Sequence, residues 1–76
     1  MEDKIKQLFA DVLQVSPDEI SEATSPDTLE KWDSLNHLNL VAAFEEEFSI
    51  DIEPEEIQAM MAGYLKFKSI ILDKTS

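Results

Sequence analysis

Apolar residues recur at helical spacing in two long segments of the chain. The first segment places five of them on one helix face, at Ile5, Leu8, Phe9, Val12 and Leu13. The second segment places four on one face, at Leu40, Val41, Phe44 and Phe48. Because mostly polar residues lie between them, these patterns predict two amphipathic helices, over about residues 3–14 and 34–47, that share a core.

The segment between these helices has the composition of a long loop. Ser16-Pro17-Asp18-Glu19 is typical of a capping box with proline at the first helical position, which predicts one short helical turn. The apolar side chains expected to point inward or pin the loop to the core are Val15, Ile20, Ala23, Leu29 and Trp32. The indole N–H of Trp32 is expected to reach a hydrogen-bond partner or water.

The C-terminal third predicts one extended loop and two further helices. Residues 49–53 alternate apolar and polar, but no second alternating segment can pair with them, so we expect a loop that buries Ile50 and Ile52. Pro54 is expected to start a third helix, and Gly63 to mark its end. The inward residues of this third helix would be Ile57, Met60, Met61 and Tyr64. A last short helix, over about residues 67–74, would bury Phe67, Ile70 and Ile71.

Together these elements predict an all-α fold. We expect a small four-helix bundle with three main helices, one short helix, and a long loop between the first and second main helices. Seventy-six residues suffice for one domain with one small core, so residues 1–76 are assigned to a single domain.

Charge and composition narrow the possible partners. The net charge is −11, from 17 acidic residues against six lysines, and such a surface repels nucleic acid and anionic lipid while attracting basic proteins. Cysteine is absent, which excludes disulfides and thiolate metal sites. We find no apolar run near the roughly 20 residues that span a bilayer, and no signal-peptide pattern. We therefore expect a cytoplasmic protein that does not insert into membranes.

Ser34 lies at the predicted start of the second helix, where unpaired N–H groups and the helix dipole favour an anion. The simpler interpretation is that Ser34 or Asp33 is only the N-cap of the helix. Asp33, Ser34 and His37 also suggest a hydrolase, but no glycine-rich turn supplies an oxyanion hole, so we expect no catalytic residues. His37 is expected to be either a surface histidine or a residue that modulates the surroundings of Ser34. The acids from Asp51 onward lack the glycine of a calcium-binding loop, so no metal site is expected.

Three features together resemble the acyl carrier protein family. Asp33-Ser34-Leu35 opens the second helix, Glu45-Glu46-Glu47-Phe48 closes it, and the chain is short, acidic and helical throughout. The resemblance implies that Ser34 carries 4′-phosphopantetheine, transferred from coenzyme A by a phosphopantetheinyl transferase. It also implies that Asp33 and Leu35 belong to the attachment motif, with Asp33 presenting the site to that enzyme and its Mg²⁺.

The same resemblance implies a docking surface and an acyl pocket. Partner enzymes that load and process the acyl group would dock through basic patches on the second helix. The docking residues would be Asn36, Asn39, Glu45 and Glu46. Two of these positions are usually acidic in the family and are asparagine here, which suggests a specialised carrier with its own partners. The acyl pocket would form between the second and third helices, at Phe44, Ile52, Ile57 and Met60.

The implied function is to carry acyl intermediates as thioesters for fatty acid, specialised lipid or secondary-metabolite biosynthesis. The chain would be a monomeric carrier and not an enzyme. Two alternatives stay open: a peptidyl or aminoacyl carrier that uses the same serine, and an acidic helical interaction module that is never modified. Identifying the tethered group would distinguish a peptidyl or aminoacyl carrier from an acyl carrier. Replacing Ser34 would distinguish a carrier, which should lose its function, from an unmodified interaction module, which should keep it.

Overall fold

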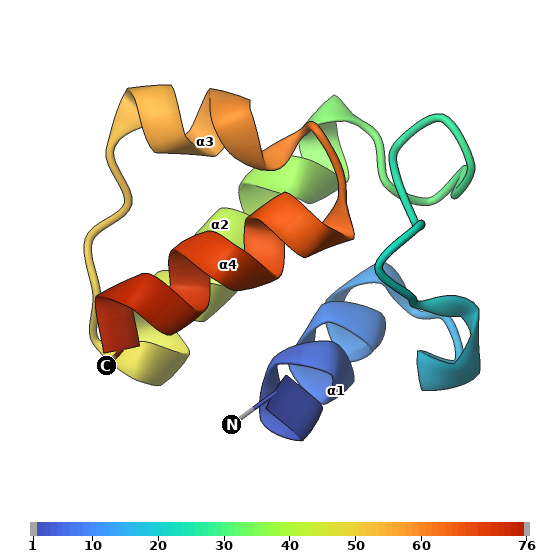
Figure 1. The fold of residues 1–76 in the computed structure, drawn as a ribbon, viewed down its shortest axis with the longest axis horizontal. Coiled ribbons are helices and arrows are strands. Elements are labelled where there is room, and N and C mark those ends of the chain that lie inside the picture. Colours follow the sequence, from blue (N-terminus) through green and yellow to red (C-terminus); the bar gives the residue numbers. More distant parts are fainter. Residues whose placement is uncertain (1, 76) are drawn as a thin grey trace.

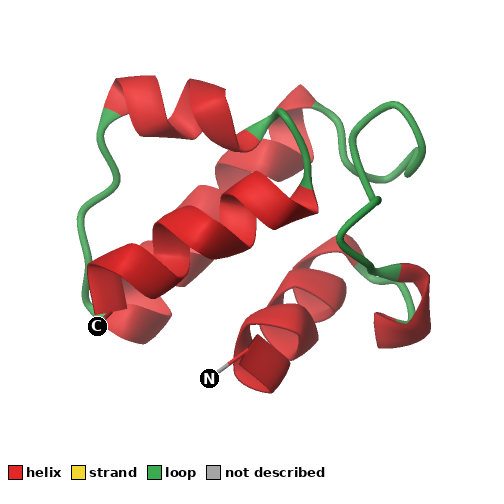
Figure 2. Cartoon of the chain, in the orientation of Figure 1, coloured by secondary structure: helices red, strands yellow, loops and turns green. Residues whose placement is uncertain are grey.

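The computed structural model describes residues 2–75, and it places four α-helices and one short 3₁₀ turn in that range. The elements are α1 (Glu2–Leu13), η1 (Pro17–Glu19), α2 (Ser34–Phe48), α3 (Pro54–Met60) and α4 (Tyr64–Thr75). No strand occurs among these residues, which confirms the all-α prediction (Figure 2). In the view of Figure 1, α1 and α3 lie on opposite sides of α4. Helix α1 packs against α2, η1 and α4, whereas α3 packs mainly against α4.

Aromatic side chains fill the centre of the core. Phe9 of α1 is fully buried and makes edge-to-face contacts with Trp32, Tyr64 and Phe67, at ring-centroid distances of 4.9, 5.0 and 5.0 Å. These rings come from α1, from the loop before α2, and from α4. One phenylalanine therefore holds three segments of the chain together.

The long loop is attached to this core largely as the sequence predicts. The capping box at η1 is present, since the Ser16 hydroxyl accepts the Asp18 N–H and the Glu19 carboxylate accepts the Ser16 N–H. Ile20, Leu29 and Trp32 are buried, and Val15 is half-buried against the core. The prediction for Ala23 is wrong, because this residue is exposed.

Thr24 is the buried residue in that part of the loop. Its hydroxyl donates to the Glu19 carbonyl at 3.2 Å and accepts the Ser21 N–H at 2.9 Å. The Thr24 hydroxyl can be buried because both of its hydrogen bonds go to backbone groups of the turn. The side chain of Ala23 has no polar atom and could not pair with these groups.

The boundary between the last two helices differs from the prediction. Helix α3 ends at Met60, three residues before Gly63, and α4 begins at Tyr64 instead of residue 67. Gly63 has φ +151°, a conformation that side chains rarely adopt, so it separates the two helices. The Tyr64 N–H donates to the Thr24 carbonyl at 2.8 Å, which ties the start of α4 to the long loop. Tyr64 thus belongs to the buried face of α4, not of α3.

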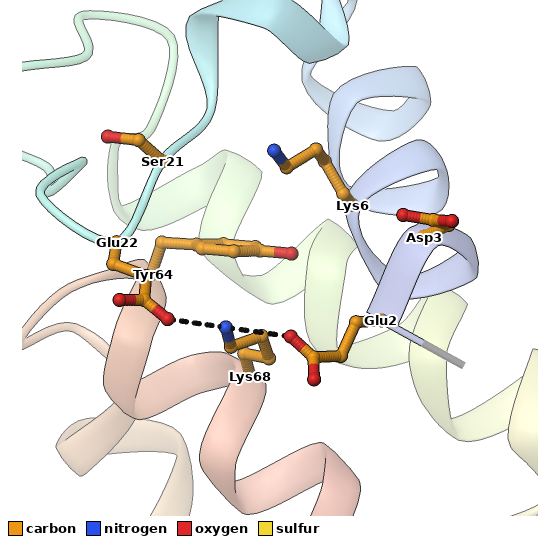
Figure 3. A pocket seen from close by; sticks show the side chains of 7 residues that line it. All are labelled: Glu2, Asp3, Lys6, Ser21, Glu22, Tyr64 and Lys68. Atoms are coloured by element: carbon orange, nitrogen blue, oxygen red, sulfur yellow. Dashed lines mark hydrogen bonds and ion pairs between the residues drawn. The ribbon is translucent and has the colours of Figure 1, made fainter.

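A small cleft lies between α1, the long loop and α4 (Figure 3). Lys68 bridges its two sides, donating to Glu2 at 3.1 Å and to Glu22 at 2.8 Å. The Tyr64 hydroxyl is buried at this cleft and finds no hydrogen-bond partner within residues 2–75. Burial raises the pKa of Tyr64 to about 12, because the phenolate would lose its hydration.

This raised pKa predicts a loss of stability at alkaline pH. The folded state holds the phenol proton more tightly than the unfolded chain, whose tyrosine pKa is 10.0. The contribution of the neutral Tyr64 phenol to the free energy of unfolding is therefore complete below pH 10.0 and is lost as the pH rises towards 12. Urea unfolding of the wild type and of Tyr64→Phe across this pH range measures the effect. The variant should lose less stability than the wild type, and equal losses would refute the contribution of Tyr64.

Candidate functional site

The start of α2 is capped by Asp33, and Ser34 is the first residue of the helix. The Asp33 carboxylate accepts the Asn36 N–H at 2.8 Å, and its carbonyl accepts the His37 N–H at 2.8 Å. The sequence left open which of the two residues is the cap. Since Asp33 is the cap, the Ser34 hydroxyl is not used for it: the residue is exposed and its hydroxyl makes no hydrogen bond in the described part of the chain.

The backbone around Ser34 fits a phosphate ester. Helix α2 is 15 residues long, and the N–H groups of Ser34 and Leu35 in its first turn find no acceptor among residues 2–75. Unpaired N–H groups and the positive end of the helix dipole both stabilise an anion held at this position. The donors present at Ser34 therefore suit the phosphate of a phosphopantetheine group.

The loop residues just before Ser34 are held in place by α2 and by the core. The Asn36 side-chain amide donates to the Lys31 carbonyl at 2.7 Å, and Trp32 is buried in the core. Asn39 in turn donates to the Asn36 side-chain oxygen at 3.3 Å. Half-buried Asn36 therefore serves to hold the loop, in addition to any contact with a partner.

The other predicted docking residues also differ in availability. Glu46 is exposed and has no ion-pair partner within residues 2–75, whereas half-buried Glu45 accepts the Ile52 N–H at 2.9 Å. Glu45 thus holds the loop that leads to α3. Of the four predicted residues, Asn39 and Glu46 are exposed and hold no backbone group in place.

Two leucines extend the exposed face of α2 beside Ser34. Leu35 is 70% exposed and Leu38 is 57% exposed, and both lie on the same face as Asn39 and Glu46. Scattered exposed leucines are ordinary, but these two adjoin the candidate site. The exposed face of α2 is therefore apolar near Ser34 and acidic near its C-terminal end.

The prediction of a surface histidine is wrong, because His37 is only 3% exposed. The Trp32 indole N–H donates to its Nδ1 at 2.9 Å, and its Nε2 lies 2.7 Å from the Ile57 carbonyl oxygen. Since an indole only donates, Nδ1 must be the acceptor and the proton must lie on Nε2, which donates to Ile57. This bonding confirms that the Trp32 N–H has a partner.

With both ring nitrogens engaged, His37 is not available to act as a base for Ser34, which removes the hydrolase interpretation. The sequence carried one indication of this burial. Position 37 precedes Leu40, Val41 and Phe44 at helical spacing, so it continues the buried stripe of α2.

The four predicted pocket residues all belong to the core or contact it. Phe44, Ile52 and Met60 are buried, and half-buried Ile57 packs against the core. They come from α2, from the loop that follows it and from α3, which is where the prediction placed them. A cavity that admits an acyl chain there stays a prediction.

Two other expectations can be compared with the described residues. No group of three or more histidine, cysteine or acidic side chains among residues 2–75 could hold a metal ion. None of the helices described is both long and apolar enough to cross a membrane.

Comparisons with known proteins point to one family. The family model described as a phosphopantetheine attachment site matches residues 3–61. An acyl carrier protein from Picosynechococcus sp. is 38% identical over 73 residues, covering 96% of this chain and 89% of the relative. One from Petrotoga mobilis is 40% identical over 57 residues, covering 74% of this chain and 66% of the relative.

The fold has a solved counterpart in the solution structure of a holo acyl carrier protein from Geobacter metallireducens. The TM-score is 0.83 at 23% identity, covering 96% of this chain and 83% of that chain. The chain therefore belongs to the acyl carrier protein family. It is an acyl carrier whose prosthetic group is 4′-phosphopantetheine.

Proposed function

We propose that Ser34 is the residue to which 4′-phosphopantetheine is attached. The observation that carries this assignment is the division of roles at the start of α2, where Asp33 caps the helix and leaves the Ser34 hydroxyl exposed and unbonded. The free N–H groups beside it add an electrostatic preference for phosphate. The matching family model covers this position.

When bound, the prosthetic group supplies the thiol that this cysteine-free chain lacks. The chain itself supplies an accessible hydroxyl and a fixed helix start. His37 does not activate that hydroxyl as a base, because it uses both ring nitrogens elsewhere. Catalysis of the attachment therefore belongs to a phosphopantetheinyl transferase that uses coenzyme A, with Asp33 helping to present the site to the enzyme and its Mg²⁺. In this role the chain is a carrier and not an enzyme.

Replacing Ser34 tests the assignment. Intact-protein mass is measured after incubation with coenzyme A, Mg²⁺ and a broad-specificity phosphopantetheinyl transferase. The wild type should gain one phosphopantetheine group and Ser34→Ala should gain none, because the alanine offers no oxygen. Ser49→Ala is the matched control, since Ser49 is also exposed and adjoins the other end of α2. Modification of Ser34→Ala would contradict the assignment.

The partners that we propose are acyl-loading and acyl-processing enzymes with basic patches that dock on the exposed face of α2. The net charge of −11 supports basic partners and a monomeric state, because copies of the chain repel one another. The apolar and uncharged start of this face, with Leu35 and Asn39, supports partners that are specialised rather than general. We propose a role in fatty acid, specialised lipid or secondary-metabolite biosynthesis in the cytoplasm.

Charge reversal at Glu46 tests this docking surface. Glu46→Lys should weaken binding to a loading or processing enzyme on the order of tenfold at low salt, and less at high salt, because exposed charges are screened. Asp11→Lys makes the same charge change on the exposed side of α1 and should have little effect. Reversal at Glu45 is avoided because it would also remove the bond to Ile52. Equal effects of Glu46→Lys and Asp11→Lys on the measured Kd would contradict the docking surface.

A further inference from the structure

The junction between α2 and α3 is held by two side-chain-to-backbone hydrogen bonds. At the C-terminal end of α2, the Glu45 carboxylate accepts the Ile52 N–H at 2.9 Å. At the end nearer Ser34, His37 donates to the Ile57 carbonyl at 2.7 Å. The backbones of α2 and α3 approach closely at few points, and α3 packs mainly on α4. The Glu45 bond thus holds the loop that leads to α3, and the His37 bond ties α3 itself to α2.

The Ile57 carbonyl is available to His37 because Ile57 lies in the last turn of α3. If the helix continued, the Met61 N–H would donate to Ile57, but it donates to the Gln58 carbonyl at 3.2 Å instead. Carbonyls in the last turn of a helix need partners from outside it. The His37 N–H supplies that partner from α2.

Trp32 fixes the direction in which His37 donates. Its indole N–H occupies Nδ1, so the ring proton stays on Nε2 and faces α3. The two rings are also stacked, with centroids 6.0 Å apart, and Phe67 packs edge-on against His37 at 6.3 Å. His37 is thus held in one orientation by the loop residue two positions before Ser34 and by α4.

We propose that His37 is a positioning residue that latches α3 onto α2 and so limits the length of acyl chain that the core accepts. The inference rests on the proposed attachment at Ser34, which lies three residues before His37 on α2. Phe44 and Met60 are fully buried, and close-packed interiors leave no room for a chain unless an element moves. Moving α3 away from α2 breaks the His37 bond and leaves the Ile57 carbonyl without its donor.

Three variants separate the latch from general loss of stability. His37→Met fills a similar space with an unbranched apolar side chain but cannot donate to Ile57. His37→Gln keeps both an acceptor oxygen and a donor amide, so it can restore both bonds. Ile5→Val loosens the core at a fully buried position of α1, away from the junction, and controls for destabilisation alone.

Amide hydrogen exchange of the unmodified proteins tests the latch directly. We expect His37→Met to speed exchange of the α3 amides, relative to those of α1, by about three- to tenfold, which is what one hydrogen bond contributes to an equilibrium. His37→Gln should stay near the wild type. Exchange in α3 that is unchanged in His37→Met, or equally fast in His37→Gln or Ile5→Val, would overturn the latch.

Chemical cleavage of the thioester tests the length limit. Proteins loaded with short, medium and long saturated acyl chains are treated with hydroxylamine, which cleaves a thioester more slowly when its chain is sheltered. We expect His37→Met to shelter longer chains than the wild type, and His37→Gln to restore the wild-type limit. Identical profiles for the wild type and His37→Met would overturn the length limit while leaving the attachment intact. Failure of the wild type to load would overturn the attachment and with it the length limit, whereas the exchange result would still decide the latch.

Discussion

Phe9→Ala is expected to remove a large part of the stability of this protein. Phe9 is fully buried and contacts the rings of Trp32, Tyr64 and Phe67. Truncating a buried phenylalanine costs about 3–5 kcal/mol, because apolar contacts are lost and a cavity remains. A chain of 76 residues has only about 4–11 kcal/mol of free energy of unfolding in total. The loss is therefore a large fraction of the total, and the variant should unfold at a much lower urea concentration than the wild type.

Urea unfolding followed by circular dichroism measures this loss. Phe48→Ala is the matched control, because Phe48 is half-buried and stacks on Phe44 at 5.6 Å near the end of α2. Less buried area is lost there, so this control should lose less than half as much stability as Phe9→Ala. Equal losses from the two variants would contradict the central place of Phe9 in the core.

The second large effect is expected at Gly63. An added Cβ would lie 3.2 Å from the Thr24 carbonyl oxygen, and the φ of +151° is strained for any residue with a side chain. The same carbonyl accepts the Tyr64 N–H, so a shift there would also disturb the start of α4. We expect Gly63→Ala to lose about 1–3 kcal/mol.

Thermal unfolding checks this effect, since each 1 kcal/mol shifts the midpoint of a domain of this size by about 4–8 °C. Ser69→Ala makes a control of similar size at an exposed position of α4, where alanine favours the helix slightly. A midpoint for Gly63→Ala no lower than that of Ser69→Ala would show that the position tolerates a side chain.

The helices with a strong apolar stripe could be predicted from sequence because their burial follows directly from spacing. Helices α1 and α2 and the capping box at Ser16 depend on residues within a few positions of one another. The boundary at Gly63 could not be predicted in the same way. It depends on the Tyr64 N–H meeting the Thr24 carbonyl, 40 residues earlier in the chain. Spacing within one segment carries no information about such a contact.

At the candidate site, too, local features could be predicted from sequence and features that depend on distant contacts could not. The motif at Asp33 and Ser34 indicated a helix start and a modifiable hydroxyl, but it could not say which residue is the cap. His37 was misassigned because its polarity was given more weight than its place on the apolar stripe. Its burial depends on Trp32 and Ile57, which supply the two partners that a buried imidazole needs.

The assignment of Ser34 as the residue that carries the prosthetic group can be tested directly. Tandem mass spectrometry of the wild type, after incubation with coenzyme A, Mg²⁺ and a phosphopantetheinyl transferase, locates the added mass on a single residue. Fragments containing Ser34 should carry the whole addition, and fragments containing only the other serines should carry none. An addition on another serine would contradict the account. So would no addition on the folded protein under conditions in which a known carrier is fully modified.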